Sequence, residues 1–305
     1  MTAPPLPEPQ PAADSERHNR LVGAGFALLA GLAFVAMDTL SKAMVGHYSF
    51  MQITWGRYVF HMLPLLLLLA ARGQLRLLRT GRPRLQLFRS VLIFFSSAVF
   101  VLALKYLPLA DTITLNYSSP LLVTALSVPL LGEKVGWRRW AAVSVGFLGV
   151  VVVIRPGLEE IHWAVALPLM TATAMAFFNI ATRMLASTDD PLTTIFYTGL
   201  VGTIAGTLVV PFVWMPPDLW GWAGLFGIGF IGFVGHLAYI HAFSYAPPSF
   251  LSPLTYLGLV WATLAGWLLF GQLPDVWTFV GMAIIAGSGL YILYRESVRR
   301  RERTA

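Results

Sequence analysis

The stretch LKYLPLADTITLNYSSPLLVTALSVPLLGEKVGWRRWAAVSVGFLGVVVVIRP, residues 104–156, decides the fold. It contains two apolar segments, at about 109–131 and 138–154, that are long enough to cross the hydrocarbon core of a bilayer. A short turn with Lys134, Arg138 and Arg139 separates them. In lipid such segments must be helices, because open strands or loops would leave backbone groups unpaired. The stretch therefore predicts two consecutive membrane-spanning helices.

The composition extends this prediction to the whole chain. Of 305 residues, 57% are hydrophobic and 11% are charged, and the mean hydropathy is +0.70. Soluble domains carry about 25% charged residues, so there are too few charges here to cover a soluble particle. The chain has no cysteine, which excludes a disulfide scaffold and thiolate chemistry. The composition predicts an all-α, polytopic membrane protein.

Ten apolar segments follow one another, and we expect each to be a transmembrane helix. The proline-rich, polar residues 1–20 lack the pattern of a signal peptide and predict a disordered cytoplasmic tail. Residues 296–305 predict a basic cytoplasmic tail. The segments lie at about 21–45, 50–70, 88–106, 109–131, 138–154, 162–185, 191–212, 220–243, 247–270 and 275–294.

The basic residues fall mostly on one side of this arrangement. With the N-terminus inside, 17 of the 21 Lys and Arg are cytoplasmic, Lys105 and Arg155 are outside, and Lys42 and Arg57 lie within spans. This agrees with the positive-inside rule and predicts that both termini are cytoplasmic. We therefore attribute the net charge of +7 to basic residues that orient the chain and lie beside anionic lipids at the cytoplasmic face. We expect no nucleic-acid partner. The cytoplasmic set is Arg17, Arg20, Arg72, Arg76, Arg79, Arg82, Arg84, Arg89, Lys134, Arg138, Arg139, Arg183, Arg295, Arg299, Arg300, Arg301 and Arg303.

The two halves of the chain resemble each other. Residues 105–109 match 244–248 and residues 130–133 match 269–272, both at an offset of 139. At an offset of 141, Asp38 pairs with Asn179. This predicts a first repeat over 21–156 and a second over 157–295, each of five helices. Because five is odd, the second repeat is inverted relative to the first, an architecture typical of secondary transporters.

Together with its second copy, residues 243–293, the opening stretch resembles the EamA-type transporters of the drug/metabolite transporter superfamily. The resemblance covers about 21–295 and depends on the Tyr-Leu-Pro element at 106–108, the Leu-Gly-Glu element at 131–133 and the run ending at Arg155-Pro156. It implies a ten-helix bundle that works by alternating access, with a cavity lined by helices 1, 3, 4, 6, 8 and 9. Gln272 stands where the family usually has Glu, as at Glu133. We interpret both as helix-end caps, so this departure concerns packing.

Charged residues inside spans are candidate functional sites, because they are costly there. Asp38 and Lys42 lie four residues apart on one face of the first span. Asp38 is predicted to face the cavity, whereas Lys42 either does so or extends to the outer surface. Arg57 either pairs with Asp38 or holds an anionic group of the substrate. His61, one turn further, is either a proton-coupling or a packing residue.

The fourth span is the most polar. Asp111, Asn116, Tyr117 and Pro120 lie in its first half, and Pro120 is expected to break the helix and free carbonyl groups. The repeat mates of Asn116 and Tyr117 are Thr255 and Tyr256, close to Pro253. Polar residues at proline breaks in both halves predict a binding site, although Ser and Thr there could also serve helix packing.

The sequence thus predicts a secondary transporter of a small organic metabolite in a bacterial inner membrane. The predicted excess of cations within the spans, Lys42 and Arg57 against Asp38, suggests an anionic or zwitterionic solute, such as an amino acid or derivative. The alternative is a vitamin or nucleoside-type solute, such as riboflavin or S-adenosylmethionine. We expect no enzymatic activity, no cofactor and no metal site, and we consider a homodimer; an intramembrane enzyme or a scaffold are remote alternatives. The candidates for substrate binding are Asp38, Lys42, Arg57, Tyr58, Asn116, Tyr117, Asn179, His236, Tyr239 and Tyr256, and those for proton coupling are Asp38, His61 and Asp111.

Overall fold

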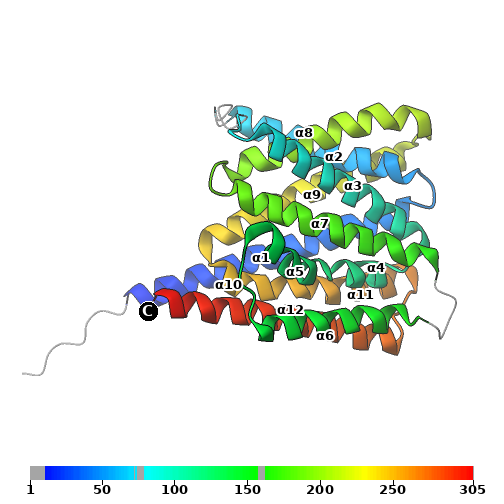
Figure 1. The fold of residues 1–305 in the computed structure, drawn as a ribbon. Coiled ribbons are helices and arrows are strands. Elements are labelled where there is room, and N and C mark those ends of the chain that lie inside the picture. The colour runs from blue at the N-terminus through cyan, green and yellow to red at the C-terminus, as the bar shows by residue number, and fades with distance from the viewer. Residues whose placement is uncertain (1–10, 72, 74–78, 157–161, 305) are drawn as a thin grey trace, which may run out of the picture.

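The fold is known from a computed structural model that describes residues 11–71, 73, 79–156 and 162–304. Ten helices in this part of the chain are long and apolar enough to cross a membrane, which confirms the predicted all-α architecture. They run back and forth through one bundle, and α1 begins at the same end where α12 stops (Figure 1). We call this end cytoplasmic, because it carries most of the basic residues.

The helix bounds follow the predicted segments closely. The first repeat contains α1 (Pro11–Met44), α2 (Phe50–Ala71), α3 (Pro83–Tyr106), α4 (Leu109–Asn116), α5 (Ser119–Leu131) and α6 (Trp137–Ile154). The second contains η2 (Trp163–Val165), α7 (Ala166–Leu185), α8 (Pro191–Val209), η3 (Val210–Val213), α9 (Leu219–Tyr245), α10 (Pro248–Leu251), η4 (Ser252–Tyr256), α11 (Leu257–Phe270) and α12 (Val276–Thr304).

The N-terminal segment differs from the predicted tail. Residues 11–20 are helical and continue directly into the first span. Pro11 starts the helix, a position where proline is well tolerated, and alanines and charged residues with good helix propensity follow it. Residues 1–10 of the expected tail lie outside the described residues, as do Arg72 and Arg76 of the expected cytoplasmic set.

The fourth and ninth spans are both interrupted. Between α4 and α5 the backbone breaks at Tyr117 and Ser118, directly before Pro120. Proline has no N–H, so it cannot bond the carbonyl of Asn116 four residues earlier. In the second repeat, the 3-10 turn η4 contains Pro253 and separates α10 from α11. The two breaks lie at corresponding places in the repeats.

The ends of these two spans also correspond. Gly132 and Gly271, 139 residues apart, both adopt the left-handed conformation, with φ of 66° and 65°. In each case the next amide bonds back to a carbonyl six residues earlier, Glu133 N to Ser127 O at 3.2 Å and Gln272 N to Gly266 O at 3.0 Å. The glycine amides also bond to carbonyls four residues earlier, at Val128 and Trp267, which is the αL helix stop. This stop favours glycine because a side chain is strained in the left-handed conformation. The Leu-Gly-Glu element is therefore a helix stop.

Close packing of α9 positions the central helices. α9 lies against α1 and α2, and α6 with α12 forms one edge of the bundle (Figure 1). A Cβ atom at Gly235 would lie 3.0 Å from the Phe34 ring and 3.2 Å from Ala33. The glycine run of α9 thus serves helix contact, as small residues do in membrane bundles.

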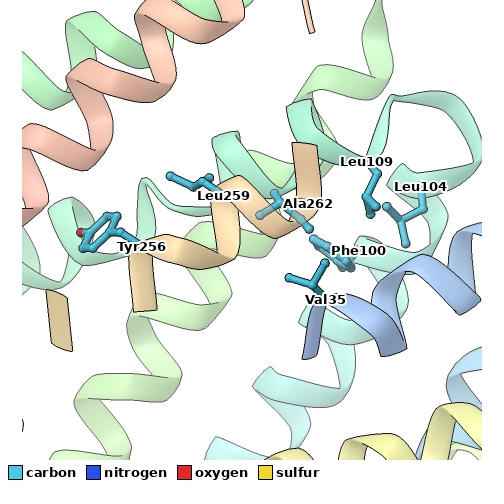
Figure 2. Close-up of a cluster of buried hydrophobic side chains, with 8 residues drawn as sticks. Val35, Phe100, Leu104, Leu109, Tyr256, Leu259 and Ala262 are labelled. Atoms are coloured by element: carbon cyan, nitrogen blue, oxygen red, sulfur yellow. The ribbon is translucent and has the colours of Figure 1, made fainter. Parts of the chain in front are cut away.

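A buried apolar cluster joins α1, α3, α4, η4 and α11 (Figure 2). Phe100 and Leu104 of α3 pack against Leu109 of α4, and Val35 and Ala262 complete this end of the cluster. Tyr256 lies at its other end, near the middle of the bundle (Figure 2). The cluster joins the two repeats, because η4 and α11 belong to the second repeat and the other helices to the first.

Candidate functional site

A cavity of about 140 Å³ lies between α1, α3, α4, α9, α10, η4 and α11, and Val35, Phe100 and Ile113 of the apolar cluster belong to its lining. Among the described residues that line it, Asp38 is the only charged one, and five carry aromatic rings. The lining residues are Ala27, Gly31, Phe34, Val35, Asp38, Phe100, Ile113, Asn116, Tyr117, Tyr239, Phe243, Leu251, Thr255 and Gly258.

Helix α1 contributes one continuous stripe to this wall. Ala27, Gly31, Phe34 and Asp38 follow one another at intervals of three or four residues, so they share one helix face. The sequence analysis selected Asp38 and missed Phe34. The same periodicity, counted back from the intramembrane carboxylate, would have found it.

Arg57 of α2 lies behind Asp38 and forms an ion pair with its carboxylate. Its guanidinium also donates a hydrogen bond to Ser97 Oγ of α3 at 3.1 Å. Both side chains of the pair are mostly buried, with 15% and 16% exposed. Asp38 thus faces the cavity, while Arg57 does not line it and joins α2 to α1 and α3.

The two helix breaks meet at the cavity. Tyr117 Oη donates a hydrogen bond to the Thr255 carbonyl at 2.6 Å, and the rings of Tyr117 and Tyr256 are 5.3 Å apart. These tyrosines are repeat mates, so their contact places the pseudo-twofold axis between them. Tyr256 Oη and Asn116 Oδ1 are buried without a hydrogen-bond partner. The Asn116 side chain lines the cavity, so its oxygen is available to a ligand. Tyr256 is not among the lining residues, and its Oη lies against Gly289 of α12.

On α9, Tyr239 and Phe243 line the cavity, and His236 lies on the same face one turn earlier. The His236 ring contacts Phe34 at 5.0 Å and His61 of α2 at 5.1 Å between centroids. His61 itself is buried behind His236. Neither histidine is among the lining residues.

Lys42 and Asp111 lie nearer the outer surface. Lys42 Nζ donates hydrogen bonds to the carbonyls of Leu104 at 3.2 Å and Leu107 at 2.8 Å, the last turn of α3. A cation is favourable at a helix C-terminus. Asp111 begins α4 and interacts electrostatically with Asp275, Arg155 and Lys42. Neither side chain lines the cavity.

Two further candidates also lie elsewhere. Tyr58 is buried and donates a hydrogen bond to the Ile93 carbonyl at 3.2 Å, with its ring against Gly202 of α8. Asn179, the repeat mate of Asp38, is exposed on α7 and is not a lining residue. The cavity is therefore asymmetric with respect to the repeats.

Arg89 corrects one assignment made from the sequence. It was assigned to the cytoplasmic set that faces anionic lipid, and it does lie near the start of α3, but it is only 5% exposed between α3, α7 and α8. Its guanidinium donates to Thr182 Oγ1 at 2.6 Å, Thr198 Oγ1 at 2.8 Å and the Thr194 carbonyl at 3.1 Å, and stacks on Phe178. The hydroxyl groups of Thr182 and Thr198 compensate for the burial of the Arg89 charge. These contacts join three helices, and the sequence does not show which helices lie side by side.

Ion pairs fasten the two ends of the bundle. At the cytoplasmic end Arg183 pairs with Glu133 at 2.7 Å, and at the outer end Arg155 pairs with Asp275. Burial raises the pKa of Asp275, but hydrogen bonds from Thr278 and Arg155 outweigh it and hold that pKa below its usual value. Asp275 therefore stays ionised down to acidic pH.

Two other features do not compete with the central cavity. A larger groove of about 480 Å³ lies between α6 and α12 at the edge of the bundle and is mostly apolar, so it fits lipid chains better than a polar solute. Within the described ranges, no group of three or more His, Asp or Glu side chains is arranged to hold a metal ion.

A ten-helix bundle of inverted repeats, with a cavity at the point where two broken helices cross, defines a secondary transporter. The model of the EamA-like transporter family matches the chain twice, over residues 21–155 and 162–294. The chain belongs to this family. It is a multi-pass membrane protein and a transporter of small molecules, not an enzyme.

Characterised relatives cover nearly the whole chain. The riboflavin transporter of Vibrio cholerae is 31% identical over 297 residues, 95% of this chain and 99% of its own. The S-adenosylmethionine uptake transporter of Rickettsia bellii is 27% identical over 275 residues, which cover 90% of this chain and 94% of its own. The pseudopaline exporter of Pseudomonas aeruginosa is 27% identical, covering 86% and 93%. One crystal structure superposes with a TM-score of 0.59 at 20% identity, covering 90% of this chain and 97% of its own, and shows the shared fold.

Proposed function

We propose that this transporter carries a solute with an aromatic ring and a positive charge, of the nucleoside or vitamin type represented by S-adenosylmethionine, across a bacterial inner membrane. The observation that carries the proposal is the lining of the cavity, five aromatic side chains around one carboxylate. Aromatic faces stack on flat rings and attract cations. Asp38 supplies a counter-charge for a sulfonium or ammonium group.

The lining also argues against the anionic solute suggested by the basic spans. The cations on which that suggestion rested do not line the cavity: Lys42 is held by the carbonyls of α3, and Arg57 lies behind Asp38 and pairs with it. An anion in the cavity would meet Asp38 and no basic side chain. Like charges in a desolvated site repel strongly.

The cavity volume fits a partly closed state. A site of about 150 Å³ holds a single benzene ring, whereas pockets for whole metabolites measure about 300–1,000 Å³. The 140 Å³ cavity therefore admits one ring. We expect alternating access to enlarge it when one side of the bundle opens.

A small amino acid is the second candidate, since Asp38 and the free Asn116 oxygen could hold an ammonium group. The test is uptake into proteoliposomes of labelled S-adenosylmethionine, riboflavin and leucine. We expect S-adenosylmethionine to be transported and leucine not. Transport of leucine without either aromatic solute would reject the proposal in favour of the amino-acid alternative.

The role of Asp38 is tested by the charge of the solute. Loss of a hydrogen bond to a charged group costs about 1.5–3 kcal/mol, so Asp38→Asn should weaken S-adenosylmethionine binding about 10- to 150-fold. Binding of uncharged riboflavin, if it occurs, should change little. Because Asp38→Asn also leaves Arg57 unpaired, the double variant Asp38→Asn/Arg57→Gln serves as control. It should regain stability but not affinity for the cation.

A further inference from the structure

Two histidines meet beside the cavity, between α2 and α9. The rings of His61 and His236 are 5.1 Å apart at an angle of 78°. His236 Nδ1 lies 2.8 Å from the Gly232 carbonyl oxygen. Because that oxygen can only accept, Nδ1 carries the hydrogen and Nε2 is left as a base. His61 is 9% exposed, and its Nε2 atom has no hydrogen-bond partner. The pair therefore offers unused proton acceptors.

The pair is connected to the solute cavity. The His236 ring is exposed and shares its α9 face with Tyr239 and Phe243, which line the cavity. Phe34 contacts His236 on one side and the cavity on the other. The Phe34 ring therefore separates His236 from the cavity, and His61 lies directly behind His236.

The charges around the pair link it to solute binding. Arg57 and Tyr58 precede His61 on α2, Arg89 faces the pair from α3, and Tyr239 follows His236 on α9. From α8, Gly199 lies against His61, and the one titratable side chain of that helix is Tyr197. Asp38 of α1 is the only carboxylate in the described spans of these five helices. A proton on the pair would therefore compete for the same carboxylate as Arg57 and as a cationic solute.

We propose that His61 and His236 form a proton-binding site whose occupancy excludes a cationic solute from Asp38. A buried imidazolium without a counter-ion is costly, so the proton enters in the conformation that opens the cavity to water. Its charge then repels the solute, and departure of the proton restores the site. The result is exchange of one proton for one solute cation. The coupling rests on the proposed function, whereas the proton site itself does not.

The coupling is tested in proteoliposomes that contain a pH-sensitive dye, with S-adenosylmethionine as the probe. We expect a gradient of the probe to drive proton flux through the wild-type protein. His61→Gln and His236→Gln should each reduce this flux at least tenfold while exchange of labelled for unlabelled probe stays within twofold. His241→Gln is the matched control, because His241 is on the same helix but stacks on Phe26. Proton flux that persists in both variants would overturn the coupling.

A second measurement does not depend on the solute. Histidine-selective NMR labelling of the protein in nanodiscs follows the imidazole resonances of both rings against pH. We expect the two to titrate in a coupled manner, so that His61→Gln changes the His236 titration but not that of His241. Resonances of both rings that stay constant from pH 4 to 9 would overturn the proton site. If the pair titrates but S-adenosylmethionine is neither bound nor transported, the proposed solute is wrong and the proton site stands.

Discussion

The contact between Tyr117 and α11 permits a sharp test of how the two repeats pack. An ideal Cβ atom at Gly258 would lie 2.6 Å from Tyr117 Oη, and the next nearest atom is Tyr117 Cζ at 3.7 Å. Gly258→Ala should therefore force the two broken helices apart. Overpacking of this kind costs about 1–3 kcal/mol, against which alanine gains up to about 1 kcal/mol of helix propensity.

The clash depends on one oxygen atom, which makes the reasoning refutable. Tyr117→Phe removes that oxygen and loses the bond to the Thr255 carbonyl, at a cost of about 1 kcal/mol. In the Tyr117→Phe background, the nearest atom to the new methyl group lies at 3.7 Å, an ordinary contact. Gly258→Ala should then cost nothing, and the double-mutant cycle should give a coupling energy of about 1–3 kcal/mol.

The assay is equilibrium unfolding of the four proteins in mixed detergent micelles. Gly287→Ala is the matched control, because no atom lies within 4 Å of its ideal Cβ position. It should be equally tolerated with and without Tyr117→Phe. If Gly258→Ala costs the same in both backgrounds, the close approach of Tyr117 to Gly258 is wrong, and with it this crossing of the broken helices.

Three further predictions concern the polar contacts outside the cavity. Arg89→Lys should lower the free energy of unfolding by about 1–3 kcal/mol, because an ammonium group cannot reach Thr182, Thr198 and the Thr194 carbonyl together; unchanged unfolding would contradict the buried position of Arg89. Glu133→Gln should change the free energy of unfolding by less than about 1 kcal/mol, because Arg183, its ion-pair partner, is 48% exposed. A larger loss in the same assay would mean that the pair of Arg183 and Glu133 is desolvated. Burial raises the pKa of Asp189, but hydrogen bonds from Thr80, Gln86 and Gly81 outweigh it and lower that pKa below its usual value. The stability from Asp189 is thus present above about pH 4 and is lost as pH falls through the lower folded value; unfolding measured from pH 6 to 3 should show a smaller acid dependence in Asp189→Asn than in the wild type.

The sequence by itself determined the architecture, because the bilayer restricts it so strongly. Apolar length predicted ten spans, and ten such helices are present in the described residues. The placement of lysine and arginine predicts that both termini are cytoplasmic. The nearly constant offset between the halves, 139 to 141 residues, predicted the inverted repeat, and Pro120 and Pro253 predicted the two helix breaks. These features depend on local chemistry or on periodicity, which a single chain displays directly.

Tertiary structure alone decided which polar residues share the site. Asp38 and Lys42 are one turn apart on α1, yet one lines the cavity and the other caps α3. Arg57 pairs with Asp38, and the buried Arg89 donates hydrogen bonds to threonines of other helices. The helices in each contact are separate elements of the sequence. Intramembrane charge shows that a residue needs a partner but not which partner it finds. The charge of the cavity, and hence the class of solute proposed, followed only from that pairing.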